Sequence, residues 1–261
     1  GVLAEVDIDG GVGNDMITLK DRGEYTDVIG SGVVSGGSGN DTITVSGEAP
    51  NLVLNGNDGN DTFTSGQAAV TINGGDGSDV ITGTSNDDEL NGGGGSDTIT
   101  AKGGNDTVTG GSGNDDIDAG SGDDAVEGGE GSDVIKGGLG DDYLNGGDQD
   151  DLLEGSSGHD LLVGGPGEDR LFGHGGVDML IGDTLDESNH VVLQGHLVTI
   201  ATSSPPPAGF DVNDIGLNDN ANTAGDDMLI GGGNYDILFG GKGNDFLFGG
   251  NFLNSGDSEV I

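Results

Sequence analysis

Aspartate recurs with a fixed spacing of nine residues through most of the chain. Nineteen nine-residue segments, here called nonads, align with one another, and their sixth position is Asp in eighteen cases and Val70 in one. Carboxylates at such regular intervals suit two kinds of chemistry: pairs of them act as general acid and base, or their oxygens bind a hard cation. Acidic pairs such as Asp123 and Asp124 recur along the repeat. Because an active site should be unique, the pattern favours cation binding over catalysis.

The eighteen aspartates at position six are the candidate metal ligands. Fifteen of the eighteen belong to a nonad with Gly at two or more of positions one, two and four, and position eight is apolar in all nineteen nonads. The segment Gly110–Asp118, which reads GGSGNDDID, shows the complete pattern. The candidates are Asp15, Asp41, Asp61, Asp79, Asp88, Asp97, Asp106, Asp115, Asp124, Asp133, Asp142, Asp151, Asp160, Asp169, Asp178, Asp227, Asp236 and Asp245.

The elements that position these aspartates follow from the same pattern. Gly readily adopts positive φ, so positions one to six predict a tight turn. Positions seven to nine predict a three-residue strand with the eighth side chain inside and its two neighbours outside. So short a strand is stable only when many stack. Two nonads close one coil of 18 residues. The sequence therefore predicts an all-β fold, a right-handed parallel β-roll (β-solenoid).

Stacked coils would bring the aspartates into two columns, because alternate nonads turn at opposite edges. We call these columns edge A and edge B. Before residue 183, edge A has nine turns and up to eight spaces between turns, whereas edge B has six turns and up to five spaces. Edge A comprises Asp15, Asp41, Asp61, Asp79, Asp97, Asp115, Asp133, Asp151 and Asp169, and edge B comprises Asp88, Asp106, Asp124, Asp142, Asp160 and Asp178.

Carboxylates in such columns repel one another. Two unit charges ~4 Å apart repel by ~1 kcal/mol in water and by ~4 kcal/mol at an effective dielectric constant near 20. A divalent cation between adjacent turns would remove this repulsion. Carboxylate and glycine carbonyl oxygens on flexible turns suit Ca²⁺ better than Mg²⁺, and the chain has no Cys to bind soft metals. We therefore expect several Ca²⁺ ions between the stacked turns.

Composition excludes several classes of partner. The 261 residues carry a formal net charge of −42, with 6 Lys and Arg against 48 Asp and Glu. Nucleic acids and anionic membrane surfaces need basic residues, so both are disfavoured as partners. No apolar run approaches the ~18 residues of a membrane span. No signal peptide is evident, and the chain begins with Gly1, so we expect processing, truncation or export by a route without an N-terminal signal.

The nonad pattern GGxGxDxUx, in which U is apolar, resembles the haemolysin-type calcium-binding repeat of RTX exoproteins. The resemblance covers residues 10–248 apart from one insertion. It implies a parallel β-roll with Ca²⁺ between successive turns, one-step (type I) secretion and calcium-triggered folding outside the cell. We expect a calcium-binding structural β-roll of a secreted or cell-surface bacterial protein. Two alternatives stay open: the C-terminal module of an exoenzyme (protease, lipase or epimerase) without its catalytic domain, and a subunit of an adhesin, surface layer or extracellular fibre.

The repeat divides the chain into four segments. Residues 1–73 predict irregular coils with calcium turns on one edge only, and residues 74–182 predict a regular β-roll. Residues 183–221 interrupt the repeat within a single edge A turn and include a candidate hairpin at Val191–Ile200. Residues 222–261 resume the β-roll.

Motifs of known catalytic sites are absent from the sequence. It contains no HExxH, GxSxG or GxxxxGK[ST], and the four histidines, at positions 159, 174, 190 and 196, do not cluster in sequence. The six Lys and Arg residues form no cluster either. We therefore expect no enzymatic activity from this chain.

The outward positions of the strands change character near the C-terminus. Positions seven and nine are mostly polar in the middle of the repeat but become apolar from about residue 152. An apolar outer face indicates that something covers it. The insertion could fold back with Val191–Ile200 over one face, and another chain or domain, or a cap on the last coil, would cover the other. The outward apolar residues are Leu152, Leu161, Val163, Phe172, Met179, Ile181, Met228, Ile230, Ile237, Phe239, Phe246 and Phe248.

Overall fold

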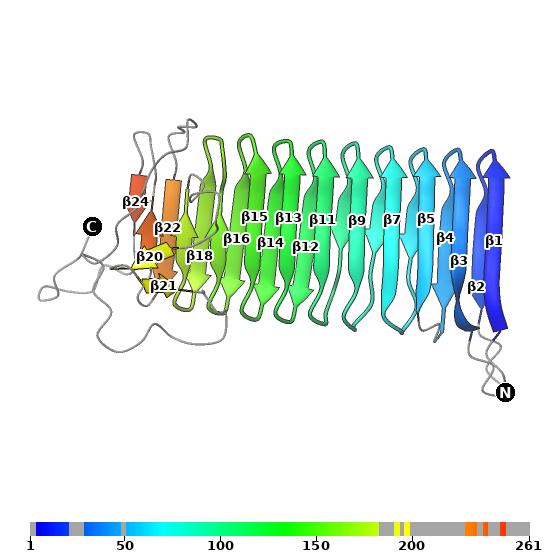
Figure 1. Ribbon diagram of the computed structural model, residues 1–261, viewed down its shortest axis with the longest axis horizontal. Helices are drawn as coiled ribbons and strands as arrows, with labels where there is room; N and C mark the ends of the chain where they lie inside the picture. Colours follow the sequence, from blue (N-terminus) through cyan, green and yellow to red (C-terminus); the bar gives the residue numbers. More distant parts are fainter. Residues whose placement is uncertain are drawn as a thin grey trace, which may run out of the picture.

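A computed structural model describes residues 4–20, 29–47, 51–182, 191–193, 196–198, 228–233, 237–239 and 246–248. Twenty-four strands and no helix occur in these ranges. Twenty-two of the strands form two parallel sheets of eleven strands each, which stack along a rod (Figure 1). No helix able to cross a membrane is found in the described ranges.

Consecutive strands alternate between the two sheets. The first sheet contains β1 (Ala4–Val12), β3 (Ile29–Ser38), β5 (Leu52–Asp58), β7 (Val70–Asp76), β9 (Glu89–Gly94), β11 (Thr107–Ser112), β13 (Ala125–Glu130), β15 (Tyr143–Asp148), β17 (Leu161–Val163), β19 (Met179–Ile181) and β23 (Ile237–Phe239). The second contains β2 (Met16–Lys20), β4 (Thr42–Ser46), β6 (Thr62–Thr64), β8 (Val80–Thr82), β10 (Thr98–Thr100), β12 (Asp116–Ser121), β14 (Val134–Leu139), β16 (Leu152–Ser157), β18 (Arg170–Gly175), β22 (Met228–Gly233) and β24 (Phe246–Phe248).

Strand register follows the nonad repeat. Ile81 pairs with Ile99, and Ile99 pairs with Ile117, so neighbouring strands of a sheet are 18 residues apart. Most strands of the regular region are longer than the three residues that the sequence predicts, because positions two and three of the next nonad also pair with the neighbouring coil. Gly111, at position two, pairs with Gly129 and continues β11 past its apolar residue.

The core is a line of apolar side chains between the two sheets. Position eight supplies one of them in each nonad, and Ile99, Ile117 and Leu144 are fully buried examples. Their side chains meet inside the coil because alternate residues of each strand point inward. The predicted all-β parallel β-solenoid with 18 residues per coil is confirmed.

The insertion leaves the register of the solenoid unchanged. Strand β22, which follows the insertion, pairs with β18, and β23 pairs with β19. The backbone N–H of Met228 also donates to the carbonyl oxygen of Asp169, at 2.8 Å. Within the insertion, β20 (Val191–Leu193) and β21 (His196–Val198) pair antiparallel.

The outer apolar positions near the C-terminal end differ in exposure. Phe246 is 57 % exposed and Met228 is 37 % exposed. Ile181, at the same strand position as Val163, is only 1 % exposed, so this outer position is covered. Partial burial is seen at Leu152, Leu161, Val163, Phe172, Met179 and Ile230, and the side chains of Ile237, Phe239 and Phe248 lie outside the described residues.

Adjacent glycines of one turn make a matched test of the close stacking of coils. Gly93 has a φ of +108°, and a Cβ there would collide with the carbonyl oxygen of Gly75 on the preceding coil, whereas a Cβ on Gly94 would lie 3.4 Å from Ser112 Oγ. We expect Gly93→Ala to lower the free energy of unfolding by about 3 kcal/mol, from backbone strain and steric overlap. Gly94→Ala should change it by less than ~1 kcal/mol. Urea unfolding in saturating calcium measures the stability of both variants. Equal effects would contradict the conclusion that Gly is needed at position two for the close approach of neighbouring coils.

Candidate metal centre

The described position-six aspartates lie inside the turns of the solenoid. All but Asp15 are buried, and Asp15 is partly buried. The Gly-rich half of each nonad curls around its own aspartate, so the carboxylate points into the coil rather than into solvent. Buried carboxylates are rare unless they are paired or bind a metal.

Each aspartate is joined to the next one in its column by a backbone hydrogen bond. On edge A, the N–H of Asp79 donates to Asp97 Oδ1 and that of Asp97 to Asp115 Oδ1, both at 2.7 Å. On edge B, the N–H of Asp106 donates to Asp124 Oδ1 at 2.8 Å. The structure thus stacks the described aspartates in the two columns that the sequence predicts.

The first coils of the rod are irregular in length, yet edge A continues through them. The N–H of Asp15 donates to Asp41 Oδ1 at 2.8 Å across 26 residues. The N–H of Asp41 donates to Asp61 Oδ1 at 2.7 Å across 20 residues. Extra residues are therefore accommodated away from the edge A turn, and the geometry of the aspartates is retained.

The second carboxylate oxygen, Oδ2, distinguishes this site from an ordinary hydrogen-bond ladder. In most described turns this atom is buried and accepts no hydrogen bond from the part of the protein that the structure describes. Such an oxygen is costly to bury unless a cation or a proton satisfies it. The aspartates concerned are Asp15, Asp41, Asp61, Asp79, Asp97, Asp106, Asp115, Asp124, Asp133, Asp142, Asp151 and Asp160.

Glycine at position one makes room for this oxygen. A Cβ built on Gly74, Gly92 or Gly110 would collide with Oδ2 of the aspartate five residues later in the same turn. The same close approach recurs at Gly128 and Gly146. In these edge A turns the first Gly of the nonad leaves room for the carboxylate, and together they form an oxygen-lined cradle. Two edge B turns carry the buried Ala101 and Ala119 at this position instead.

Burial makes the ionised form of these aspartates unfavourable. It raises the pKa of Asp142 to about 8, although a hydrogen bond from the backbone of Asp124 opposes the shift and the neighbouring carboxylates add to it. Burial likewise raises the pKa of Asp151 and Asp160 to about 7. The pKa is raised to about 6, again mainly by burial, for Asp61, Asp79, Asp97, Asp106 and Asp133.

The donor set fits a hard cation. Carboxylate and backbone carbonyl oxygens are the ligands that Ca²⁺ prefers, and it accepts the irregular geometry of turns. Three or more His, Cys, Asp or Glu side chains do not come together as a metal-binding group within the described ranges. A cation between turns would therefore need backbone carbonyls as well as aspartates.

Comparison with protein families agrees with this donor set. The model of the RTX calcium-binding nonapeptide repeat matches residues 29–47, 55–90, 91–126, 118–153, 127–162, 154–184 and 222–253, which is more than half of the chain. The chain belongs to this RTX repeat family. No curated protein matches it at a significant level. RTX repeats bind calcium, and the resemblance noted in the sequence is confirmed.

Some predicted site residues of the RTX chain lie outside the described residues. These are Asp227, Asp236 and Asp245. His159 takes part in hydrogen bonds between coils: its Nδ1 accepts from the backbone N–H of Val177, at 2.8 Å.

A second ladder, at position five, was not predicted from the sequence. The backbone N–H of Asn60 donates to Asn40 Oδ1, and that of Ser78 donates to Asn60 Oδ1, both at 3.0 Å. It runs along the outside of the turns beside the aspartate columns. The frequent Asn, Ser and Asp at position five is the signal that would have revealed it, because these short side chains accept backbone hydrogen bonds.

Folding of the metal-free chain should depend on pH with a definite sign. In the metal-free fold the raised pKa values mean that folded carboxylates hold protons more tightly than unfolded ones, so stability present below about pH 4 is lost as pH rises to 6–8. In chelator, we therefore expect the trimethylamine N-oxide concentration needed for half-folding to rise between about pH 5 and 7.5. The calcium concentration at the folding midpoint should change little over the same range, because the carboxylates of the unfolded chain are already ionised there. Circular dichroism titrations at fixed ionic strength measure both, and a metal-free midpoint independent of pH would argue against burial of these carboxylates.

Proposed function

We propose that this RTX chain is a calcium-dependent structural module, without catalytic activity, of a secreted or cell-surface bacterial protein. The observation that supports it most strongly is the buried Oδ2 atom that recurs at position six in most described turns and accepts no hydrogen bond from the residues that the structure describes. The ligands would be position-six aspartates together with turn carbonyls. Bound calcium would supply positive charge between the turns. The aspartates orient their oxygens through the hydrogen bonds from coil to coil, and the position-one glycines keep the cradle open.

Folding is proposed to follow export. With a net charge of −42 the chain repels itself in the absence of cations, which favours an extended state suited to passage through a secretion channel. Outside the cell, calcium would bind the stacked turns and convert the chain into a rod. The RTX family match and the charge support this order of events.

A structural role is favoured over an enzymatic one by the sameness of the turns. The hydrogen bond from Asp97 to Asp115 repeats between Asp115 and Asp133 with nearly the same length, 2.7 and 2.8 Å. A catalytic site would require one turn whose residues or geometry differ from those of the other turns. The exposed Phe246 and Met228 also favour contact with another chain or domain at the C-terminal end of the rod. The flanking coding sequence distinguishes the attached partner: an upstream catalytic domain indicates an exoenzyme, and adhesive domains indicate an adhesin or fibre.

Counting bound ions tests the proposed function. Native mass spectrometry of the protein in saturating calcium should show several Ca²⁺ ions per chain, and calorimetry should show cooperative uptake. Equal concentrations of magnesium should leave most sites unfilled, because Mg²⁺ keeps its waters and requires regular octahedral geometry. A chain that takes up no calcium under these conditions would refute the proposal.

A further inference from the structure

Asp88, the first aspartate of edge B, has a different environment from the other aspartates of the columns. Its Oδ2 accepts a hydrogen bond from the backbone N–H of Thr84 at 2.6 Å. Its Oδ1 accepts from Thr84 Oγ1 at 3.0 Å and from the backbone N–H of Val70 at 2.9 Å. Asp88 is 4 % exposed, so the protein satisfies both oxygens inside the turn without help from solvent.

Thr84 provides two of these three donors. It stands at position two of the nonad, where all edge A turns but that of Asn57 carry Gly before the insertion, and its side chain is 1 % exposed. Its hydroxyl oxygen also accepts a hydrogen bond from the backbone N–H of Asn86, at 3.1 Å. The side chain therefore fills the interior of its own turn and uses the carboxylate oxygen that is left without a donor in turns such as that of Asp106.

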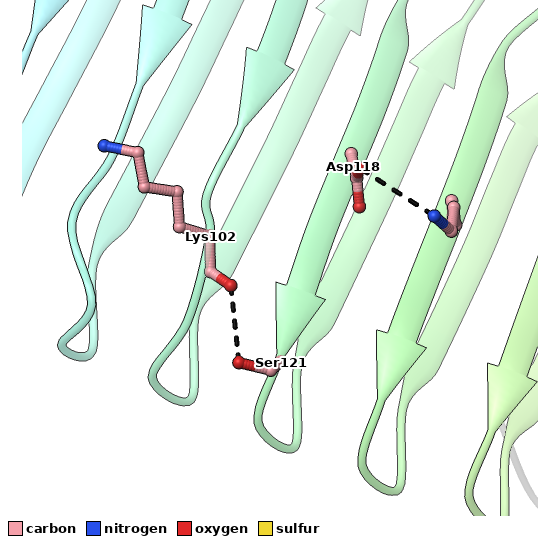
Figure 2. A network of polar contacts seen from close by, with 4 residues as sticks. Lys102, Asp118 and Ser121 are labelled. Atoms are coloured by element: carbon pink, nitrogen blue, oxygen red, sulfur yellow. Dashed lines mark hydrogen bonds and ion pairs between the residues drawn. The ribbon is translucent and has the colours of Figure 1, made fainter.

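Lys102 brings a positive charge to the same turn from the next coil. Its Nζ donates to the carbonyl oxygen of Gly83 at 2.6 Å. Figure 2 shows the side chain extended toward the preceding coil, while the Lys102 carbonyl oxygen accepts a hydrogen bond from Ser121 on the following one. Burial raises the pKa of Asp88, and the charge of Lys102 is among the influences that oppose this rise.

The backbone of Lys102 is held in a conformation that suits Gly. Its φ is +84°, in the left-handed region. A side chain there costs of order 1 kcal/mol or more. The position-two residue of the next regular edge B turn, Gly120, has a similar φ of +106° without that cost. The hydrogen bond from the Lys102 ammonium group to the carbonyl oxygen of Gly83 offsets this strain. Turn carbonyl oxygens are among the proposed calcium ligands.

We propose that Thr84 and Lys102 replace calcium in the first turn of edge B, so that the space between turns 83–88 and 101–106 takes no metal and the edge B calcium column begins at Asp106. This inference rests on the proposed function, since it concerns where the calcium sites end. It reduces the spaces for calcium on edge B before the insertion from five to four. The coil that contains Asp88 would then form the N-terminal end of the edge B column without a metal ion.

The test compares the number of calcium ions bound by two double variants of the same mass. Thr84→Gly with Lys102→Gly restores Gly at both position-two sites, and this variant should bind one more Ca²⁺ ion than the wild type. Thr82→Gly with Lys136→Gly exchanges the same residue types on strands β8 and β14, outside the turns, and should bind the wild-type number. Native mass spectrometry in saturating calcium counts the ions, and circular dichroism establishes that each variant is folded.

The wild-type protein provides a second measurement that needs no variant. Anomalous diffraction from crystals grown in calcium should show ions beyond Asp106 on edge B and none between the turns of Asp88 and Asp106. An ion in that space would overturn the inference, as would a folded Thr84→Gly, Lys102→Gly variant with an unchanged ion count. A wild-type chain without any bound calcium would instead refute the proposed function, so the two failures are distinguishable.

Discussion

In excess chelator at low ionic strength and neutral pH, the chain is expected to lose nearly all of its β structure, and calcium should restore it. The reason lies in the two aspartate columns, where buried carboxylates stand one coil apart along the whole regular region. Without a cation each must either hold a proton or remain charged in a poorly solvated position, and both are costly at neutral pH. The core between the sheets is a line of single apolar side chains, and its burial stabilises the fold too little to offset that cost.

Far-UV circular dichroism measures this transition directly. The metal-free spectrum should be that of a coil, and the β signal should return over a narrow range of calcium concentration, because neighbouring coils share their sites. High concentrations of sodium chloride serve as a control for general charge screening and should restore much less structure than millimolar calcium. A metal-free chain that keeps the full β spectrum at low salt would contradict the proposal.

Much of the fold could be predicted because the repeat specifies it several times over. Position eight predicts the core, and the nine-residue spacing places Asp97 and Asp115 one coil apart in the same column. The register across the insertion was also recoverable, since Asp169 and Met228 keep the phase of the repeat on either side. Repetition makes such predictions reliable, because the pattern of the neighbouring nonads corrects an irregularity in any one of them.

Features that belong to a single nonad were harder to predict. Position two of edge B holds Thr84 and Lys102, which in the sequence look like losses of Gly. Their effect depends on a hydrogen bond within one turn and on another between coils, at Asp88 and Gly83. Strand length differs from the prediction for a related reason: the Gly-rich positions predict a turn, but the neighbouring coil supplies backbone partners that extend the strand. Tertiary context overrides local propensity in both cases.

Substitution of Asp115 by Asn is expected to have opposite effects with and without calcium. Asp115 is buried, and its Oδ1 accepts the backbone N–H of Asp97 at 2.7 Å, a bond that Asn can keep. Burial raises the pKa of Asp115, so removal of its charge should favour the metal-free fold. The same change removes a charged ligand and should raise the calcium concentration at the folding midpoint by about tenfold, or ~1.4 kcal/mol.

Two titrations on one variant separate these effects. In chelator, Asp115→Asn should need less trimethylamine N-oxide than the wild type to reach half-folding, since this osmolyte favours compact states. In calcium buffers, it should need more calcium. Asp116→Asn is the matched control, because the Asp116 side chain points outward from β12 and is exposed. It should change either midpoint only slightly. A purely structural role for Asp115 predicts losses in both titrations, whereas calcium ligation by a buried carboxylate predicts a gain in the first and a loss in the second.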